Sequence, residues 1–185
     1  MYKELYEEVL LEHRKVFEAQ KEEDFDALID AIEKAEKIFV YGAGREGIAA
    51  RSFAMRLMHL GKETHWLMDD TTPGMHEHDL FIGVDGSGKI GYIDYFLEMG
   101  MKTGAKTAVI TGSPLERIPQ AADICLFVPA AVYKGTDPRV VPTKQPMGNL
   151  FEQHLFLLFD ILIMMMEERF GISHEEMESR HRNIE

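Results

Sequence analysis

Residues 37–47 read KIFVYGAGREG, and this stretch decides the fold class. Residues 37–41 form a short run rich in β-branched and aromatic side chains that stops abruptly at Gly42, and a helical pattern begins at Arg45. Such a run, followed by glycines and then a helix, is typical of a buried parallel strand and its turn. The glycines permit a sharp turn, and the start of the next helix offers free N–H groups that can hold an anion.

The same alternation repeats along the chain. It predicts strands at 37–41, 63–68, 80–84, 107–110 and 124–128, with helices at 45–59 and 92–102. Alternation at this pitch indicates an α/β fold, a five-stranded parallel sheet flanked by helices in a flavodoxin-like sandwich. Right-handed crossovers then bring the strand-to-helix loops to one edge of the sheet.

Further helices are predicted at both ends of the chain. Apolar spacing indicates helices over 2–20 and over 25–35, the second with Asp24 as its N-cap. A helix over 149–170 is apolar nearly all round, so we expect it to be buried against the sheet, a partner subunit or both. Ser173 and Glu176 form the pattern of a capping box for a last short helix.

These elements predict a single domain with four segments. They are an N-terminal helical segment at 1–36, an α/β core at 37–130, a loop at 131–147 and C-terminal helices at 148–185. A chain of 185 residues can bury a core without a disulfide or metal.

Composition excludes several classes of function. The net charge of −12 disfavours nucleic-acid binding. The longest apolar stretch, 155–166, is much shorter than the roughly 20 residues of a membrane span. The acidic, amphipathic start is unlike a signal peptide. Cys125, the one cysteine, cannot form an internal disulfide and is predicted to be a small buried hydrophobe, so we expect a cytoplasmic protein.

Two glycine loops are the predicted ligand site. The first spans 42–47 and the second, Asp85-Gly86-Ser87-Gly88-Lys89, also lies between a strand and a helix. In open α/β sheets, ligands bind where such loops converge. The first loop also matches G-x-G-x-x-G, with Asp69 or Asp70 downstream, but five strands leave no second half for a dinucleotide. His76-Glu77-His78 is a weaker candidate for a metal site, because no second pair stands at a matching spacing.

Five stretches, in order, resemble the 6-phospho-3-hexuloisomerase family of the sugar isomerase (SIS) fold. They are YGAGR at 41–45, FAMRLMHLG at 53–61, TTP at 71–73, PMGNLFE at 146–152 and RHRNIE at 180–185. The resemblance implies an isomerase that moves a sugar carbonyl between neighbouring carbons through an enediol, without a metal or redox cofactor. It implies Glu152 as the base, assisted by His181, and a homo-oligomer, a dimer or tetramer.

Each of these two residues has a simpler interpretation. Glu152 could be the reciprocal partner of Asn149 in a helix capping box, and His181 could be a solvated terminal residue. The whole chain could also be a non-catalytic sugar-binding or regulatory module.

The resemblance implies substrate binding by both loops and by the Thr71-Thr72 pair. The binding residues it indicates are Gly42, Gly44, Arg45, Glu46, Thr71, Thr72, Asp85, Gly86, Ser87, Gly88 and Lys89. The chain departs from the family where phosphate hydroxyls are expected, since Glu46, Asp85 and Ile90 replace them. The two carboxylates would repel phosphate. They could instead point outward, Glu46 could pair with Lys89 or Arg45, or the ligand could be a neutral or amino sugar.

Overall fold

A computed structural model describes residues 1–184 and contains one parallel sheet. Its strands are β1 (Lys37–Gly42), β2 (Glu63–Trp66), β3 (Leu80–Val84), β4 (Lys106–Thr111) and β5 (Ile124–Phe127). Their order is β2-β1-β3-β4-β5, and every neighbouring pair is parallel. This is the flavodoxin-like order, so the predicted sheet and fold class are confirmed.

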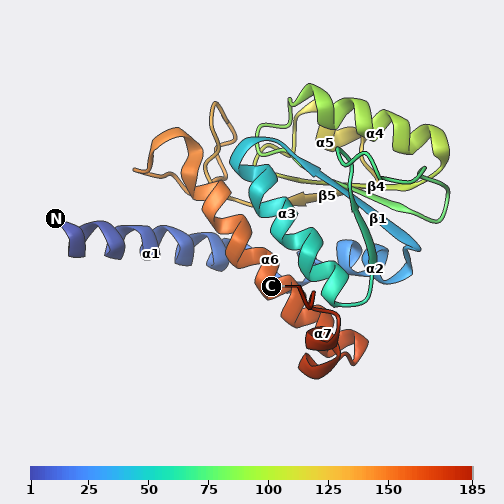
Figure 1. Cartoon of the computed structure of the whole chain (residues 1–185). Helices are drawn as coiled ribbons and strands as arrows, with labels where there is room; N and C mark the ends of the chain where they lie inside the picture. The colour runs from blue at the N-terminus through green and yellow to red at the C-terminus, as the bar shows by residue number, and fades with distance from the viewer. Residues whose placement is uncertain (185) are drawn as a thin grey trace.

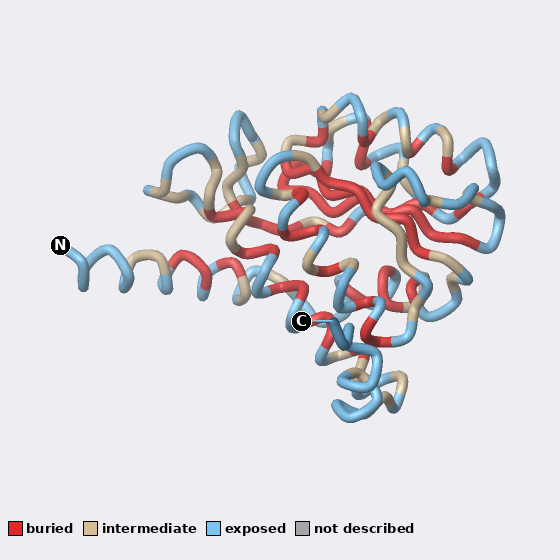
Figure 2. The backbone as a smooth tube through the Cα atoms, viewed as in Figure 1, coloured by how far each residue is buried: buried red, intermediate tan, exposed pale blue. Residues whose placement is uncertain are grey.

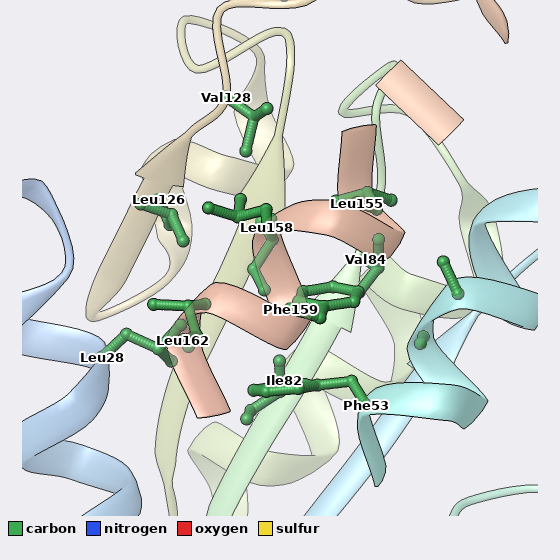
Figure 3. Packing of buried hydrophobic residues seen from close by; sticks show 14 of the residues in the cluster. Leu28, Phe53, Ile82, Val84, Leu126, Val128, Leu155, Leu158, Phe159 and Leu162 are labelled. Carbon is green, nitrogen blue, oxygen red and sulfur yellow. The ribbon is translucent and has the colours of Figure 1, made fainter. Parts of the chain in front are cut away.

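Helices cover both faces of the sheet (Figure 1). On one face lie α2 (Asp26–Lys34), α3 (Gly44–His59) and α6 (Asn149–Phe170), and on the other lie α4 (Gly91–Thr103) and α5 (Arg117–Ala121). The larger core is on the α3 and α6 side. There the rings of Phe53 and Phe159 stack with centroids 4.4 Å apart over Ile82 and Val84 (Figure 3).

Helix α6 is buried along one side and exposed along the other. Leu155, Phe159 and Leu162 are almost completely buried, whereas Phe156 and Met164 are 41% and 65% exposed. By length and composition, the segment from Pro146 to Phe170 could cross a membrane, but half of its most apolar window is buried inside the protein. Burial of this kind is what a core helix shows, so α6 is a core helix with an uncovered apolar stripe.

Helix α1 (Tyr2–Ala19) projects from the body, and only its second half is covered (Figures 1 and 2). The Glu12 carboxylate accepts hydrogen bonds from Thr143 Oγ1, Lys144 N and Gln145 Nε2 at 2.7 to 2.9 Å. The His13 ring packs against the buried His154 on α6. The first turns therefore display apolar side chains to solvent, among them Tyr2, Leu5 and Leu10, which are 61% to 82% exposed.

The structure tests three further local predictions. The remaining elements are η1 (Glu22–Asp24), η2 (Pro146–Gly148) and α7 (His174–Ser179). The capping box of Ser173 and Glu176 is confirmed. Asp24 as the cap of α2 is wrong, because its carboxylate accepts the Lys21 N–H of the preceding 3-10 turn. Cys125 is exposed rather than buried, because its side chain points to the face of β5 opposite to the one that buries Leu126 in the larger core.

Gly148 is required for the start of α6. It precedes the helix with a φ of 71°, and a Cβ there would lie 2.0 Å from the backbone N of Tyr133. We expect Gly148→Ala to lower the free energy of unfolding by about 2 to 3 kcal/mol, because a strained φ is added to a backbone clash. Chemical denaturation measures this change.

Gly171→Ala is the matched control, because Gly171 has a φ of 66° and a Cβ added there would meet no atom within 4 Å. It carries the φ strain alone and should cost about 1 kcal/mol. Equal losses in the two variants would contradict the packing argument.

Candidate functional site

The two glycine loops flank the point where the strand order reverses. Residues 42–47 lead from β1 into α3 on one face, and residues 85–90 lead from β3 into α4 on the opposite face. A crevice forms at such a switch point, outside the carboxyl ends of the strands. The sheet topology therefore brings the two loops to the same crevice, as the sequence predicts.

Close packing explains two glycines of the first loop, Gly42 and Gly47. A Cβ on Gly47 would lie 2.4 Å from the carbonyl oxygen of Gly42, so these two backbones touch. Arg45 lies in the first turn of α3, and its Nε is 3.2 Å from a Glu152 carboxylate oxygen. This ion pair links the first loop to the start of α6.

The second loop is organised around a fully buried carboxylate. Asp85 Oδ1 accepts hydrogen bonds from Ser87 Oγ at 3.0 Å and from the Gly88 N–H at 2.8 Å. Asp85 Oδ2 accepts the Ile90 N–H at 2.8 Å. The Thr111 hydroxyl on β4 donates to the Gly86 carbonyl at 3.3 Å. Asp85 therefore points into its own loop rather than outward, and the loop is fixed against the sheet.

Glu46 joins the two loops. Its Oε2 accepts the Gly86 N–H at 2.9 Å, so it pairs with neither Arg45 nor Lys89. The pKa of Glu46 is raised to about 8, chiefly by burial and partly by the nearby charges of Asp85 and Glu152, against the lowering effect of the Gly86 hydrogen bond. At neutral pH this side chain is mostly a neutral carboxylic acid, which can both donate and accept a hydrogen bond.

Glu152 stands beside this group on the first turn of α6. Its side chain is 19% exposed, and burial raises its pKa although Arg45 opposes the shift. The alternative in which Asn149 and Glu152 form a capping box is wrong. Gly148 is the N-cap residue, and the Asn149 amide donates instead to Gln145 Oε1 at 2.9 Å.

The other predicted binding residues lie at the same edge with differing roles. Lys89 pairs with Glu116 at 2.9 Å. Thr72 Oγ1 donates to the Trp66 carbonyl at 2.8 Å, and Thr71 is exposed beside it. Ile90 packs against the core under α4, so the hydroxyl expected there is replaced by a packing contact.

An aromatic cluster next to the loops was not predicted from the sequence. The Tyr41 ring lies 5.3 Å from Trp66 and 6.3 Å from Tyr92, and Arg51 stacks over Trp66 at 4.5 Å. The signal was present, because Tyr41 directly precedes the first loop and Tyr92 closely follows the second. Tyr92 is 61% exposed and offers a ring face at the site.

His181 lies far from this group within one chain. Its ring stacks on His59, with centroids 5.3 Å apart, at the carboxyl end of α3, whereas Arg45 and Glu152 meet at the amino end. At 1.5 Å per residue the two ends of α3 are roughly 20 Å apart. His181 instead lines a separate cavity of about 860 Å³ between the end of α3, α6, α7 and the tail. A single chain does not bring together Glu152 and His181.

The metal hypothesis gains no support from the geometry. Within residues 1–184, no three His, Cys, Asp or Glu side chains are grouped so that they could hold a metal ion. His78 of the suspected pair lies 3.4 Å from the carboxylate of Glu77, its neighbour in sequence.

A 2-1-3-4-5 parallel sheet, two glycine loops at its switch point and the Glu152 carboxylate on α6 are the features expected of an α/β domain of the sugar-isomerase class. Residues 31–144 match the family model described as the SIS domain. The chain is 37% identical over 163 residues to the 3-hexulose-6-phosphate isomerase of Bacillus subtilis (strain 168), covering 88% of each chain. It is 32% identical to the protein of the same name in Methanocaldococcus jannaschii, over 86% of this chain and 83% of that one.

The chain therefore belongs to the SIS domain family and, within it, to the 3-hexulose-6-phosphate isomerase group. A Methanococcus jannaschii structure, described as inferring a 3-hexulose-6-phosphate isomerase function, has a TM-score of 0.83 and 28% identity, with 98% of this chain and 99% of that one covered. A Vibrio vulnificus protein complexed with ManNAc-6P shares the fold, with a TM-score of 0.73 and 15% identity, over 94% of this chain and 64% of that one.

Proposed function

We propose that this protein is a sugar or sugar-phosphate isomerase that shifts a carbonyl between adjacent carbons through an enediol. The observation that carries the proposal is Glu152, which stands beside Arg45 and Glu46 of the first glycine loop, with a raised pKa and with Arg45 at 3.2 Å. The family supports the same reaction, since several relatives are named 3-hexulose-6-phosphate isomerase. We propose further that the enzyme acts in the cytoplasm.

Glu152 would act as the general base. Its carboxylate removes the proton from the carbon next to the carbonyl, and the electron pair of that C–H bond forms the enediolate. The same carboxyl group returns the proton to the neighbouring carbon, so one residue completes the transfer. Burial raises the pKa of Glu152, which makes its carboxylate a stronger base than an exposed glutamate.

Arg45 would stabilise the charge that develops during the reaction. The guanidinium remains charged at all working pH values and donates several hydrogen bonds in fixed directions. Placed beside Glu152, it can hold the enediolate oxygen while the carboxylate moves the proton. Proton exchange from deuterated solvent into the carbon-bound positions of a sugar, followed by NMR, tests this chemistry directly.

The role of His181 would require a second copy of the chain. The roughly 20 Å between His181 and Glu152 in one chain excludes direct cooperation there, whereas a neighbouring subunit could bring its tail to the Glu152 edge. Uncovered apolar side chains on α1 and α6, such as Leu10 at 63% and Met164 at 65% exposure, provide surface for such packing. We propose a homo-oligomer, a dimer or tetramer, with the site shared between subunits.

Subunit complementation tests the shared site. Glu152→Gln and His181→Ala should each be inactive alone, but mixing them through a denaturation and refolding cycle should restore activity. In a mixed dimer, one of the two sites receives an intact Glu152 and an intact His181. A 1:1 mixture should therefore recover about a quarter of native activity. Activity of the His181→Ala variant alone at the native level would contradict the role of His181.

A non-catalytic sugar-binding module is the second candidate. It is favoured by the separation of His181 from Glu152, and a related domain occurs in an Escherichia coli protein named as a transcriptional regulator, at 25% identity. The chain spans half the length of that regulator. A module of this kind would be stabilised by sugars without exchanging their protons, so the NMR experiment separates the two candidates.

A further inference from the structure

The 85–90 loop contains hydrogen-bond donors of the kind that hold phosphate. The loop turns through Gly88, which has a φ of 69°, and leads directly into α4. The N–H groups of Gly88 and Ile90 and the hydroxyl of Ser87 converge on one point. Convergent backbone N–H groups at the start of a helix form an anion-binding concavity.

In this chain the anion at that point is a side chain of the protein. The Asp85 carboxylate accepts all three donors at 2.8 to 3.0 Å and is fully buried. A further N–H of the loop, that of Gly86, donates a hydrogen bond to Glu46 Oε2 at 2.9 Å. A Cβ added to Gly86 would lie 2.8 Å from the other Glu46 oxygen, so these groups are in close contact.

The cations carried by the two loops also have carboxylate partners. Lys89 pairs with Glu116 at 2.9 Å, and Arg45 pairs with Glu152 at 3.2 Å. A phosphate entering the loop would have to displace Asp85 from three hydrogen bonds and leave a buried carboxylate without donors. It would also lie beside that negative charge, where the exclusion of water strengthens repulsion.

We infer that the Asp85 carboxylate occupies the anion-binding position of this site, so that the ligand presents an uncharged hydroxyl group to the two loops. The ligand is an unphosphorylated sugar. This inference rests on the proposed function for the location of the site, and it names Asp85 and Glu46 as the residues that determine specificity.

Glu46 fits a hydroxyl ligand better than an anion. Because its pKa is raised to about 8, it is mostly protonated at pH 7 and offers one donor and one acceptor, which matches the hydrogen-bonding pattern of a sugar hydroxyl. The exposed ring of Tyr92 beside the loop adds an apolar face against which the C–H side of a sugar can pack.

The test is a binding comparison between the native protein and the variant Glu46→Ser/Asp85→Ser/Ile90→Thr, which replaces the two carboxylates and the isoleucine with hydroxyls. The probes are D-fructose, fructose 6-phosphate and inorganic phosphate at matched ionic strength, followed by thermal shift and calorimetry. We expect the native protein to respond to D-fructose at least as strongly as to fructose 6-phosphate, with no response to inorganic phosphate.

The triple variant should gain binding of fructose 6-phosphate. The expected rise in Tm is about 5 to 10 °C at a hundredfold excess over Kd. Asp85→Asn, which keeps the shape of Asp85 but removes its charge, should gain at least tenfold in affinity for fructose 6-phosphate and serves if the triple variant does not fold. The inference would be overturned if the native protein bound fructose 6-phosphate more tightly than D-fructose, and if the variants bound fructose 6-phosphate no more tightly than the native protein does.

The binding comparison tests the specificity inference, and proton exchange tests the isomerase proposal, so either one can be contradicted without the other. If the native protein prefers the phosphorylated sugar and still exchanges its protons, the specificity inference is wrong and the isomerase proposal stands. If it prefers the unphosphorylated sugar but exchanges no protons, the inference stands and the isomerase proposal is wrong.

Discussion

Replacing Glu152 by glutamine is expected to lower the rate of isomerisation by about 10²- to 10⁴-fold, the usual contribution of a general base. Glutamine preserves the size of the side chain and can still accept a hydrogen bond from Arg45, but it cannot carry the proton between carbons. The loss should appear in kcat, because a sugar can still bind at the loops. Both turnover and solvent proton exchange into the sugar measure it.

Glu168→Gln is the matched control, since it removes an exposed carboxylate from the same helix, away from the loops. It should leave kcat unchanged. The Glu152→Gln variant should also retain a native Tm, because the capping box that would have made Glu152 structural is absent. A variant with full turnover would exclude Glu152 as the base and, with it, the proposed mechanism.

Glu46 is expected to make the protein less stable as the pH rises. The folded protein retains the Glu46 proton until about pH 8, whereas the unfolded chain releases it near pH 4.5. Between these values the folded state binds more protons, so its stability falls as pH rises and is lowest above pH 8. Glu46→Gln has no proton to release, and it should be more stable than the native protein at pH 9 by between about 3 and 5 kcal/mol.

At pH 4 the advantage of the glutamine variant should vanish, because both proteins are then neutral at position 46. Urea denaturation at several pH values measures the difference. Glu98→Gln, on the exposed side of α4, controls for the loss of one carboxylate and should follow the native curve. Parallel pH profiles for the native protein and Glu46→Gln would show that Glu46 is not held neutral in the fold.

The strands of the sheet could be predicted from sequence because each strand is marked by residues within its own short segment. Short apolar runs that end at Gly42 and Gly86 mark buried strands and their turns without reference to any other part of the chain. The start of α6 was predicted correctly, but its cap was not. A favourable capping pair at 149 and 152 gave way to Gly148, because the backbone of 132–133 approaches so closely that only glycine fits.

The candidate site could be located from sequence but not read in detail. The sequence predicts that Asp85 either repels phosphate or points outward, whereas its carboxylate points into its own loop and accepts three hydrogen bonds there. That role depends on the direction of its side chain, which the Gly88 turn sets. The pKa of Glu46 is raised by charged groups that lie 39 or more residues away in the sequence. His181 is separated from Glu152 by the length of helix α6. Such relations arise only when the chain is folded.

The projecting part of α1 has a consequence for how the protein should behave on dilution. Its second half is held by Glu12 and by the ring contact of His13, but the turns around Tyr2 and Leu5 have few contacts with their own chain. A short isolated helical segment is marginal in water. Its backbone amides should therefore exchange quickly with deuterium in a separate subunit, and slowly if another subunit covers them as in the proposed homo-oligomer. The protection of residues 2–10 would then report the fraction of assembled, site-competent molecules at each concentration.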